Sequence, residues 1–597
     1  MTGPDATTLN RMFLESCRTH RKPVRMMVKK DGDWTRISTD EIETTVRRLS
    51  LGFQALGIGP GDRIAILSEN RPEWVMADFA ALAAGAVTVP IYTSLPPDQV
   101  GYILGDAGAK FVVCSDLDLW SKVEAVRSGL PALERVIVIE GDPPAGTHDL
   151  SDVVEMGRRL EEEEPGRFER TAGATRPGDL ASIIYTSGTT GRPKGVMLSH
   201  ANFVSNVLAL AEVIDFCSDD TALSFLPLSH VFERTATFFQ FHVGAAIAYA
   251  ESVEAVASNM IEVRPTIVVS VPRLFEKIYS RIMDQIMAGS RLKRGIFVWA
   301  LATGKKYAAR TISGARVPAH LAFKRGLARK LVFSKITART GGRVRYFICG
   351  GAPISKDIIE FFFAIGLMVL PGYGLTETSP VLSANTPPDR IRFGTVGKVL
   401  PGIAIRIAGD GEILARGPNI MMGYYKNDAD TREVLKDGWL HTGDIGRFDE
   451  DGFLIITDRK KDIIVTSGGK NVAPQPIESL IQASPYVASA VVVGNSRKFI
   501  SALVVPDFDK LEAYARENGL AFRDRAELCR LPKIAAFLLE EVNRMTPGLA
   551  SYERVKKIAV LDRDFDIGAG EVTPTLKVRR NIVEQKYADI IESLYGE

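Results

Sequence analysis

The residues with the clearest chemical potential form a polar loop directly after a predicted strand that ends at Ile183-Ile184-Tyr185. Glycines let backbone N–H groups approach an anion, hydroxyls add donors, and a lysine supplies positive charge. Ten consecutive positions combine these types: Thr186, Ser187, Gly188, Thr189, Thr190, Gly191, Arg192, Pro193, Lys194 and Gly195. A Walker A loop would end in Gly-Lys-Ser/Thr and open a helix, which this stretch does not. The composition predicts a phosphate-binding loop of another kind rather than an ordinary flexible turn.

Further motifs follow in order along the chain. They are LPLSH at 226–230, GGAP at 350–353, GYGLTET at 372–378, WLHTGD at 439–444, DRKKD at 458–462 and EVTPTLKVRR at 571–580. Together with YTSGTTGRPKGVMLSH at 185–200, they resemble the signature blocks of the AMP-forming (ANL) adenylating enzymes, which comprise acyl-CoA synthetases, luciferases and peptide-synthetase adenylation domains. The resemblance extends down the whole chain and does not depend on one loop.

The resemblance implies that the chain binds ATP and Mg²⁺. The loop from Thr186 to Lys194 would hold the β and γ phosphates, and Thr376 would donate to the α phosphate. Glu377 would bind Mg²⁺, whose oxygen chemistry suits one carboxylate together with substrate phosphates. An isolated glutamate is most often a surface residue, but the setting of Glu377 within GYGLTET favours the metal role.

The same resemblance places the adenosine of ATP. Tyr373 would stack on adenine beside the backbone of Gly351, Ala352 and Pro353. Asp444 would accept hydrogen bonds from the ribose hydroxyls, and Arg459 would hold the ribose from the other side.

Two further residues are candidates for catalysis. His230 follows an apolar run, where a histidine is usually a core residue, but the family resemblance implies that it lines the acyl pocket near the reacting carboxylate. Lys577 would stabilise the α phosphate during adenylation. A surface lysine in a basic tail is the alternative for Lys577, because Arg579 and Arg580 lie beside it.

The resemblance also implies a second half-reaction with coenzyme A after the C-terminal domain rotates about a hinge at Lys461. The turn at Gly468 and Gly469 would then pass near the pantetheine channel. A tight turn between two strands is the alternative interpretation of this glycine pair.

The substrate is indicated by HVFER at 230–234, VPRLFEK at 271–277 and the phenylalanines at 361–363, which resemble the long-chain fatty acyl-CoA synthetase branch. We therefore expect ATP-dependent activation of a long-chain fatty acid to acyl-CoA through an acyl-adenylate, with release of AMP and pyrophosphate. The nearest alternative is a fatty acyl-AMP ligase that loads a carrier protein. A catalytically silent acyl-nucleotide-binding protein fits poorly, because the expected charged residues are all present.

The composition sets outer limits on the interpretation. The chain has 597 residues, with 46% apolar and 24% charged residues, which is typical of a large globular protein. The five cysteines form no Cys-x-x-Cys pair, which argues against a disulfide scaffold or structural zinc. No apolar segment of about twenty residues is present, and the first twenty residues do not resemble a secretory signal. We expect a cytoplasmic protein that could also contact the inner face of a membrane.

Alternating helical and strand patterns must position these residues. Helices are predicted at 42–56 and 72–84, and strands at 63–67, 110–114 and 135–139, which implies parallel sheet with helices on its faces. We predict an α/β fold with a large N-terminal domain of several subdomains at residues 1–460, followed by a small mobile α+β domain at 461–597.

Charge is distributed unevenly along the chain. Residues 285–356 contain 16 Lys and Arg but no Asp or Glu, which leaves 58 basic and 72 acidic residues for the rest of the chain. Apolar residues are interleaved with these cations, at Ile296, Phe297, Trp299, Leu301, Leu321, Phe323, Leu327, Leu331, Val332 and Phe333. Such helices can lie on anionic membrane or attract an anionic ligand; a solvated helical face over the core is the alternative. The apolar interleaving argues against nucleic acid as a partner.

Overall fold

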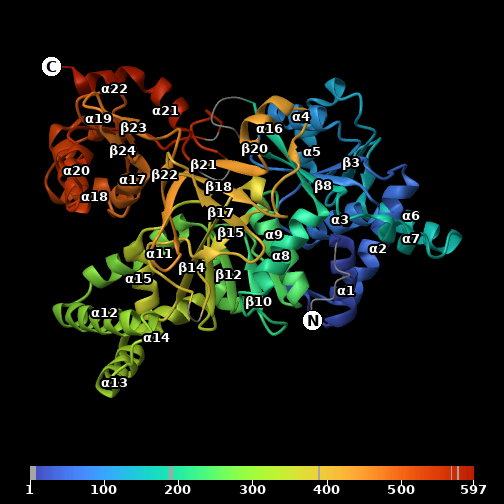
Figure 1. The fold of residues 1–597 in the computed structure, drawn as a ribbon, viewed down its shortest axis with the longest axis horizontal. Coiled ribbons are helices and arrows are strands. Elements are labelled where there is room, and N and C mark those ends of the chain that lie inside the picture. The colour runs from blue at the N-terminus through green and yellow to red at the C-terminus, as the bar shows by residue number, and fades with distance from the viewer. Residues whose placement is uncertain (1–7, 187–191, 388–389, 567, 574–576, 597) are drawn as a thin grey trace.

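The computed structural model describes residues 8–186, 192–387, 390–566, 568–573 and 577–596 (Figure 1). It has the α/β architecture expected from the sequence, with two large sheets that contain parallel strands and a smaller antiparallel sheet before the C-terminal part. No helix within the described ranges is both long and apolar enough to cross a bilayer.

An eight-stranded sheet carries the predicted phosphate loop. Its order is β19-β9-β8-β4-β3-β5-β6-β7, and the strands from β8 to β7 in that order are parallel. The strands are β3 (Arg63–Leu67), β4 (Val87–Ile91), β5 (Phe111–Cys114), β6 (Arg135–Val138), β7 (His148–Asp149), β8 (Leu180–Thr186), β9 (Lys194–Ser199) and β19 (Gly423–Tyr424). Their nearly unbroken Val and Ile runs are typical of parallel strands that are covered on both faces.

The helices that accompany the first two sheets are α1 (Leu9–Thr19), α2 (Thr39–Ala55), α3 (Pro72–Ala83), α4 (Pro97–Ala107), α5 (Leu117–Glu124), α6 (Leu150–Glu163), α7 (Arg167–Ala174), α8 (His200–Ala211) and α9 (Val231–Val243). All five elements predicted in this part of the chain are confirmed, as α2, α3, β3, β5 and β6, with ends that differ by at most three residues. Aromatic side chains of α1, α3, α8 and α9 pack in one hydrophobic core, including Phe13 stacked on Phe79 at 4.5 Å between ring centroids.

A nine-stranded sheet has the order β16-β15-β14-β13-β12-β10-β11-β1-β2. Its strands are β1 (Met26–Lys30), β2 (Asp33–Ile37), β10 (Thr221–Ser224), β11 (Ala246–Tyr249), β12 (Ile267–Ser270), β13 (Tyr346–Cys349), β14 (Met368–Gly374), β15 (Val381–Ala384) and β16 (Lys398–Val399). The six strands from β14 to β1 are parallel. Parallel strands present their carboxyl ends at one edge, which is where open α/β sheets bind ligands.

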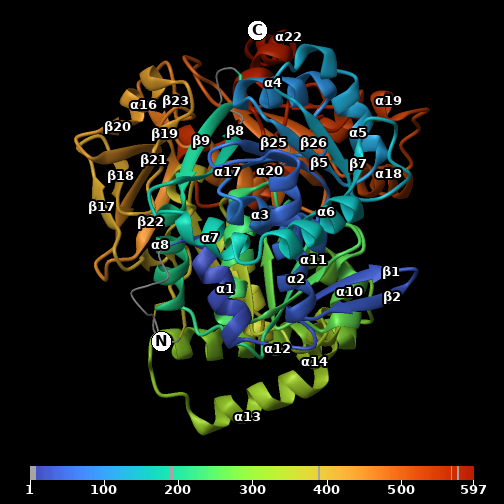
Figure 2. The same cartoon turned by 90° about the vertical axis from the view of Figure 1, so that its right-hand side faces the viewer.

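Residues 285–356, which we call the basic segment, form an extension of helices at one side of this sheet (Figure 1). It contains the end of α11 (Pro272–Met287), then α12 (Arg291–Ile312), α13 (Ala319–Ala328) and α14 (Ser334–Thr337). Helices α10 (Val256–Val263) and α15 (Lys356–Ile365) flank it in the chain, and α12 packs closely on α15, since a Cβ at Gly304 would meet the Ala364 carbonyl oxygen at 2.4 Å. Figure 2 shows α13 projecting from the body of the molecule.

The third sheet is antiparallel and leads to the C-terminal part. It is built from β17 (Ala404–Ile407), β18 (Glu412–Arg416), β20 (Leu435–Lys436), β21 (Trp439–Phe448) and β22 (Leu454–Arg459), with α16 (Asp428–Val434) before β20.

The C-terminal part mixes strands and helices around hydrophobic clusters of its own (orange to red in Figure 1). A ribbon of β23 (Ile464–Val465) and β24 (Asn471–Val472) precedes a sheet of β25 (Val487–Val493), β26 (Ser501–Pro506) and β27 (Ile558–Val560). Its helices are α17 (Pro474–Gln482), α18 (Phe508–Glu517), α19 (Arg525–Arg530), α20 (Pro532–Met545), α21 (Arg580–Lys586) and α22 (Ala588–Tyr595). Lys510 of α18 forms an ion pair with Asp284 of α11 at 2.6 Å. The domain division at residue 461 and the mobility of this part stay predictions.

Candidate active site

The predicted phosphate loop connects two adjacent antiparallel strands. Thr186 ends β8, Lys194 begins β9, and these two residues are direct cross-strand partners. Five predicted loop residues lie outside the described residues: Ser187, Gly188, Thr189, Thr190 and Gly191. A Cβ at Gly195 would meet the Ile183 side chain at 2.6 Å, so close packing of β9 on β8 requires glycine there. The pairing therefore fixes both ends of the loop in one place.

Two contacts hold the Lys194 ammonium in one orientation. Its Nζ lies 2.5 Å from Oδ2 of Asp430 and 5.3 Å from the centre of the Tyr424 ring. Asn427, the N-cap of α16, donates from its side-chain amide to the same Asp430 oxygen at 2.8 Å. The lysine thus has a defined carboxylate partner.

The loops after β13 and β14 meet at the carboxyl edge of the nine-stranded sheet. Gly351, Ala352 and Pro353 follow β13 and are exposed to solvent. Tyr373 lies near the end of β14, whose Pro371 pairs with Cys349 of β13. Gly374 has no room for a side chain, because a Cβ would meet the Pro380 carbonyl oxygen at 1.7 Å. The structure thus brings Tyr373 and the GGAP loop to one edge of the sheet, while their role beside adenine stays a prediction.

The hydrogen-bonding end of Tyr373 meets two residues of the third sheet. Its hydroxyl donates to Oδ2 of Asp444 at 2.6 Å, and Nε of Arg459 lies 3.2 Å from Oδ1 of the same carboxylate. Asp444 and Arg459 are cross-strand partners in β21 and β22. Burial and the Asp444 charge raise the pKa of Tyr373 well above its usual value, so the phenol stays protonated as a donor. Tyr373, Asp444 and Arg459 therefore form one cluster, joined by a hydrogen bond and an ion pair.

Thr376 and Glu377 lie in a short turn, Thr376–Thr378, directly after β14. Oε1 of Glu377 accepts a hydrogen bond from the Tyr424 hydroxyl at 2.8 Å. The backbone of the turn is also held, because Met421 N donates to the Glu377 carbonyl at 2.9 Å and Asn419 donates to the Thr378 carbonyl at 2.8 Å. Among the described residues, no hydrogen-bond partner is found for the Thr376 hydroxyl.

The Lys577 ammonium, in the C-terminal part, is influenced by the charges of this cluster. Its backbone N–H donates to Thr573 Oγ1 at 3.1 Å, and residues 574–576 lie outside the described part. The side chain retains solvent exposure, yet surrounding protein atoms and the Arg459 charge lower its pKa to about 8, against the opposing effects of Asp444 and Glu377. The charges of Arg459, Asp444 and Glu377 therefore all act on the Lys577 ammonium.

His230 lies within the electrostatic reach of Lys577. It is the N-cap of α9, where its Nδ1 accepts a hydrogen bond from Phe232 N at 3.1 Å. Burial, with a smaller contribution from Lys577, lowers the pKa of His230 to about 3. The imidazole is therefore neutral with its proton on Nε2, a donor rather than a base. The role of His230 in substrate positioning stays a prediction.

The two charged residues that follow His230 on α9, Glu233 and Arg234, do not pair with each other. Arg234 forms a buried bidentate ion pair with Asp78 of α3, at 2.6 and 2.8 Å. Both carboxylate oxygens of Glu233 are buried without a hydrogen bond of standard geometry. On a helix, consecutive side chains point in different directions and do not face each other, which explains why these two residues do not pair.

Lys461, Gly468 and Gly469 follow the third sheet in the chain: Lys461 comes after β22, and the two glycines lie between β23 and β24. Gly469 has φ +72°, and its N–H donates to Thr466 O at 2.9 Å in the turn between β23 and β24. The tight-turn interpretation of this glycine pair is therefore confirmed, while its role beside pantetheine stays a prediction. Lys461 follows β22 and lines the cavity described next.

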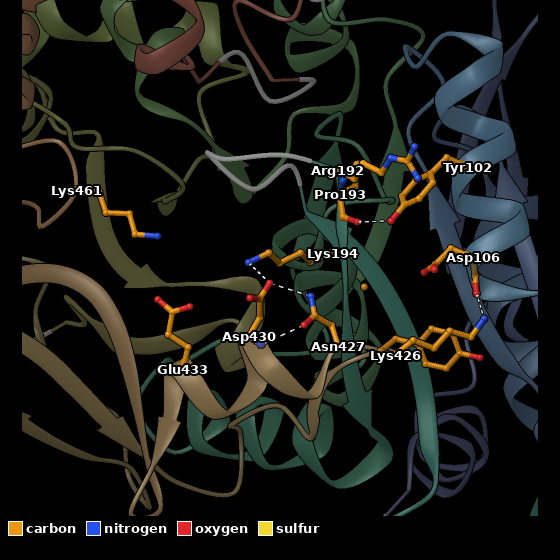
Figure 3. A pocket seen from close by; sticks show the side chains of 12 residues that line it. Tyr102, Asp106, Arg192, Pro193, Lys194, Lys426, Asn427, Asp430, Glu433 and Lys461 are labelled. Carbon is orange, nitrogen blue, oxygen red and sulfur yellow. Dashed lines mark hydrogen bonds and ion pairs between the residues drawn. The ribbon is translucent and has the colours of Figure 1, made fainter.

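A polar cavity of about 400 Å³ lies beside Lys194 (Figure 3). Its wall combines four basic side chains, Arg192, Lys194, Lys426 and Lys461, with the acids Asp106, Asp430 and Glu433. Figure 3 shows Lys194 and Lys461 directed toward Asp430 and Glu433. The cavity is therefore suited to charged rather than apolar ligands.

Two residues that contact the predicted site residues, Tyr424 and Asp430, were not predicted from the sequence. Both belong to the segment GYYKNDADT at 423–431, which contacts Glu377 through Tyr424 and Lys194 through Asp430. The sequence features that could have indicated them are the aromatic pair Tyr424-Tyr425 and the helix start at Asn427, both shortly before WLHTGD. Their contacts are long-range in sequence, so spacing alone could not assign them.

The geometry defines a class of protein. The described residues supply the cations, carboxylates and donors that nucleotide binding requires, in the Lys194–Asp430 pair, the Tyr373–Asp444–Arg459 cluster, Glu377 and Lys577. Residues 15–425 match the family described as AMP-binding enzyme, and residues 461–597 match its C-terminal domain. The chain belongs to this AMP-binding enzyme family.

Curated relatives and solved structures agree with that family. The chain is 37% identical over 571 residues to long-chain-fatty-acid–CoA ligase FadD15 of Mycobacterium bovis, covering 95% of this chain and 93% of that protein. It is 32% identical to the peroxisomal long chain acyl-CoA synthetase 6 of Arabidopsis thaliana, with 100% and 87% coverage. ATP-bound MatB from Rhodopseudomonas palustris superimposes with a TM-score of 0.67 at 26% identity, covering 98% and 99%. Anthranilate CoA ligase AuaEII gives 0.74 at 20% identity and 98% coverage of both, which supports the fold alone.

Proposed function

We propose that the chain is an AMP-forming ligase that activates long-chain fatty acids to acyl-CoA through an acyl-adenylate. The observation that carries the proposal is the match to long-chain ligases over almost the whole chain. The Tyr373–Asp444–Arg459 cluster supports it, because the charges of Asp444, Arg459 and Glu377 all act on the Lys577 ammonium. That arrangement supplies positive charge and donors where two anions, ATP and a carboxylate, must meet.

In the first half-reaction, the fatty acid carboxylate attacks the α phosphorus and pyrophosphate leaves. We assign the β and γ phosphates to Lys194 and the loop from Thr186, and the α phosphate to Thr376 and Lys577. Tyr373, with Gly351, Ala352 and Pro353, would form the adenine pocket. Asp444 and Arg459 would bind the ribose. The neutral His230 would donate from Nε2 to the substrate carboxylate, since its Nδ1 is already occupied.

The residues present fit a Mg²⁺ ion that relies mostly on its substrate. Among the described residues, no group of three or more His, Cys, Asp or Glu side chains could hold a metal. Glu377 has one oxygen held by Tyr424, which leaves the carboxylate oriented with further lone pairs available. One protein carboxylate together with substrate phosphates is a usual Mg²⁺ environment. When bound, the ion would neutralise phosphate charge.

In the second half-reaction, the thiolate of coenzyme A would attack the acyl-adenylate and release AMP. We assign the hinge to Lys461, and the pantetheine path to the turn at Gly468 and Gly469. A fatty acyl-AMP ligase that transfers to a carrier protein is the competing function, and the names of the curated relatives favour coenzyme A.

The direct test uses purified protein with Mg²⁺, ATP and a mixture of fatty acids from short to long, with and without coenzyme A. We expect long-chain acyl-CoA and AMP by mass spectrometry. Each buried methylene contributes about 0.8 kcal/mol, so several chain lengths should react. Acyl-AMP that accumulates despite coenzyme A would favour carrier loading, and no adenylate from any acid would refute the substrate class.

Contact with an anionic membrane is a second part of the proposal. The apolar residues of the basic segment divide into two groups: Phe297 and Phe333 are buried, whereas Phe323 is 76% exposed and Leu327 and Leu331 are 40% and 45% exposed. Those three recur every four residues along α13 and the turn of helix after it, so they share one face. Lys324, Arg329 and Lys330 are exposed beside them. Insertion of this face at the cytoplasmic surface of a bilayer would bring the enzyme to its lipid substrate.

Flotation with liposomes tests this contact. We expect binding to vesicles with anionic lipid at low salt, weaker binding at high salt, and loss of binding when Phe323, Leu327 and Leu331 are replaced with serine. Val253 and Ile261, which are 63% and 55% exposed outside this segment, provide the matched serine control. Equal flotation of both variants, or none by the wild type at low salt, would refute the contact.

A further inference from the structure

Lys194, the lysine of the phosphate loop, is already neutralised by a carboxylate from another part of the chain. Asp430 Oδ2 lies 2.5 Å from Lys194 Nζ, and both side chains are about 30% exposed, at 31% for the lysine and 28% for the aspartate. Lys194 lowers the pKa of Asp430, so the carboxylate is ionised. An incoming phosphate must therefore compete with Asp430 for the lysine.

Asp430 is itself held in position. Asn427 donates to Asp430 Oδ2 at 2.8 Å and accepts from the Asp430 N–H at 3.1 Å. The chain before it is tied to β9, because Tyr424 pairs with Val196 and Tyr425 N donates to the Gly195 carbonyl at 2.7 Å. The segment that carries Asp430 is therefore anchored to β9, the strand that begins with Lys194.

Space and charge beside this pair suit an exchange of partners. The cavity of about 400 Å³ is lined by both residues and by Glu433 and Lys461 (Figure 3). Lys461 also lowers the pKa of Asp430 through its charge. Lys461 is therefore a second cation that would stabilise the Asp430 carboxylate when Lys194 binds a phosphate.

We infer that Asp430 is a positioning residue for the nucleotide reaction: it is the counter-ion that Lys194 gives up when polyphosphate binds and takes back when pyrophosphate leaves. The inference rests on the proposed function of Lys194 as a phosphate ligand. Its physical consequence is that Asp430 weakens the binding of ATP and pyrophosphate, and thereby speeds product release.

The test compares Asp430→Asn with Asp428→Asn, which removes the same charge from an exposed position on the same helix. A partly exposed ion pair contributes up to about 1 kcal/mol, so we expect Asp430→Asn to tighten the binding of inorganic pyrophosphate and ATP by about threefold to fivefold in calorimetry. Because pyrophosphate would leave this variant more slowly, kcat should fall if product release limits turnover. The KM for ATP should fall as well. Asp428→Asn should change neither affinity.

A double-mutant cycle makes the assignment specific to Lys194. In the Lys194→Met background, Asp430→Asn should no longer tighten pyrophosphate binding. Weaker binding of both ligands by Asp430→Asn, or the same gain without Lys194, would overturn the inference. Wild-type protein that binds neither ATP nor pyrophosphate would instead refute the proposed function, because binding of these probes does not depend on which acid is activated.

Discussion

The hydroxyl of Tyr424 donates a 2.8 Å hydrogen bond to Oε1 of Glu377, across 47 positions of sequence. Burial and the neighbouring carboxylate raise the pKa of Tyr424, so the phenol remains a donor across the physiological range. The carboxylate proposed to bind Mg²⁺ is thus oriented by a residue from the segment that also supplies Asp430.

Replacing Tyr424 with phenylalanine removes only this hydrogen bond. Because bonds to charged groups contribute about 1.5–3 kcal/mol, we expect about tenfold weaker Mg²⁺-dependent binding of a non-hydrolysable ATP analogue, measured by calorimetry. Binding of the analogue without metal should change little. Tyr425→Phe is the matched control, and an equal loss in both variants would contradict a specific role for Tyr424.

Lys577 should act in one half-reaction only. Replacement with alanine is expected to abolish adenylation while leaving thioester formation from supplied acyl-AMP, because its charge faces the α phosphate in the proposed site. Pyrophosphate exchange and coenzyme A acylation measure the two steps separately. Retention of both half-reactions would refute the assignment.

The pH dependence of adenylation follows from the same lysine. A pKa of about 8 means that Lys577 is charged below that pH and loses its charge above it. We expect kcat/KM for ATP in the adenylation step to fall by about tenfold per pH unit above pH 8, and Lys577→Arg to extend the plateau to higher pH because arginine stays charged. A wild-type profile that is flat to pH 10 would contradict this environment.

The Arg234–Asp78 ion pair should be essential for stability. Both side chains are only 1% exposed, and Arg234 also donates to Ser182 and Thr88. Removing one partner of a buried pair costs about 3–5 kcal/mol, so Arg234→Ala should lower the free energy of unfolding by that amount in urea titrations. The exposed pair of Arg18 with Glu15 is the control, whose loss should leave the unfolding midpoint nearly unchanged.

Glu233 should make stability depend on pH. Burial raises its pKa to about 8, and a nearby Ser224 opposes this only partly. A carboxyl whose pKa is raised on folding stabilises the fold fully below its unfolded value, and this stabilisation is lost as pH rises toward the folded value. Between about pH 4.5 and 8, wild type should lose up to about 1.4 kcal/mol per pH unit relative to Glu233→Gln. Parallel stability curves for the two proteins would contradict this expectation.

Local patterns in the sequence were sufficient to predict several elements in the first third of the chain and to recognise the motifs. The strand 63–67 and the helix 72–84 were predictable because side-chain periodicity and turn residues act over a few positions. The polar loop from Thr186 to Lys194 was recognisable for the same reason, because its glycines, hydroxyls and lysine lie within ten positions, whereas the pairing of β8 with β9 was not predicted. The charge of residues 285–356 could also be counted directly.

Only the tertiary structure decided which side chains meet. Arg234 pairs with Asp78 rather than its neighbour Glu233, and Lys194 pairs with Asp430, because sheet pairing and helix packing bring together residues that are more than 150 positions apart. The division of the basic segment into buried Phe333 and exposed Phe323 likewise depends on which face packs on the core. Residue types and short spacings determined the chemistry available to this protein, whereas long-range packing determined its partners, burial and protonation states.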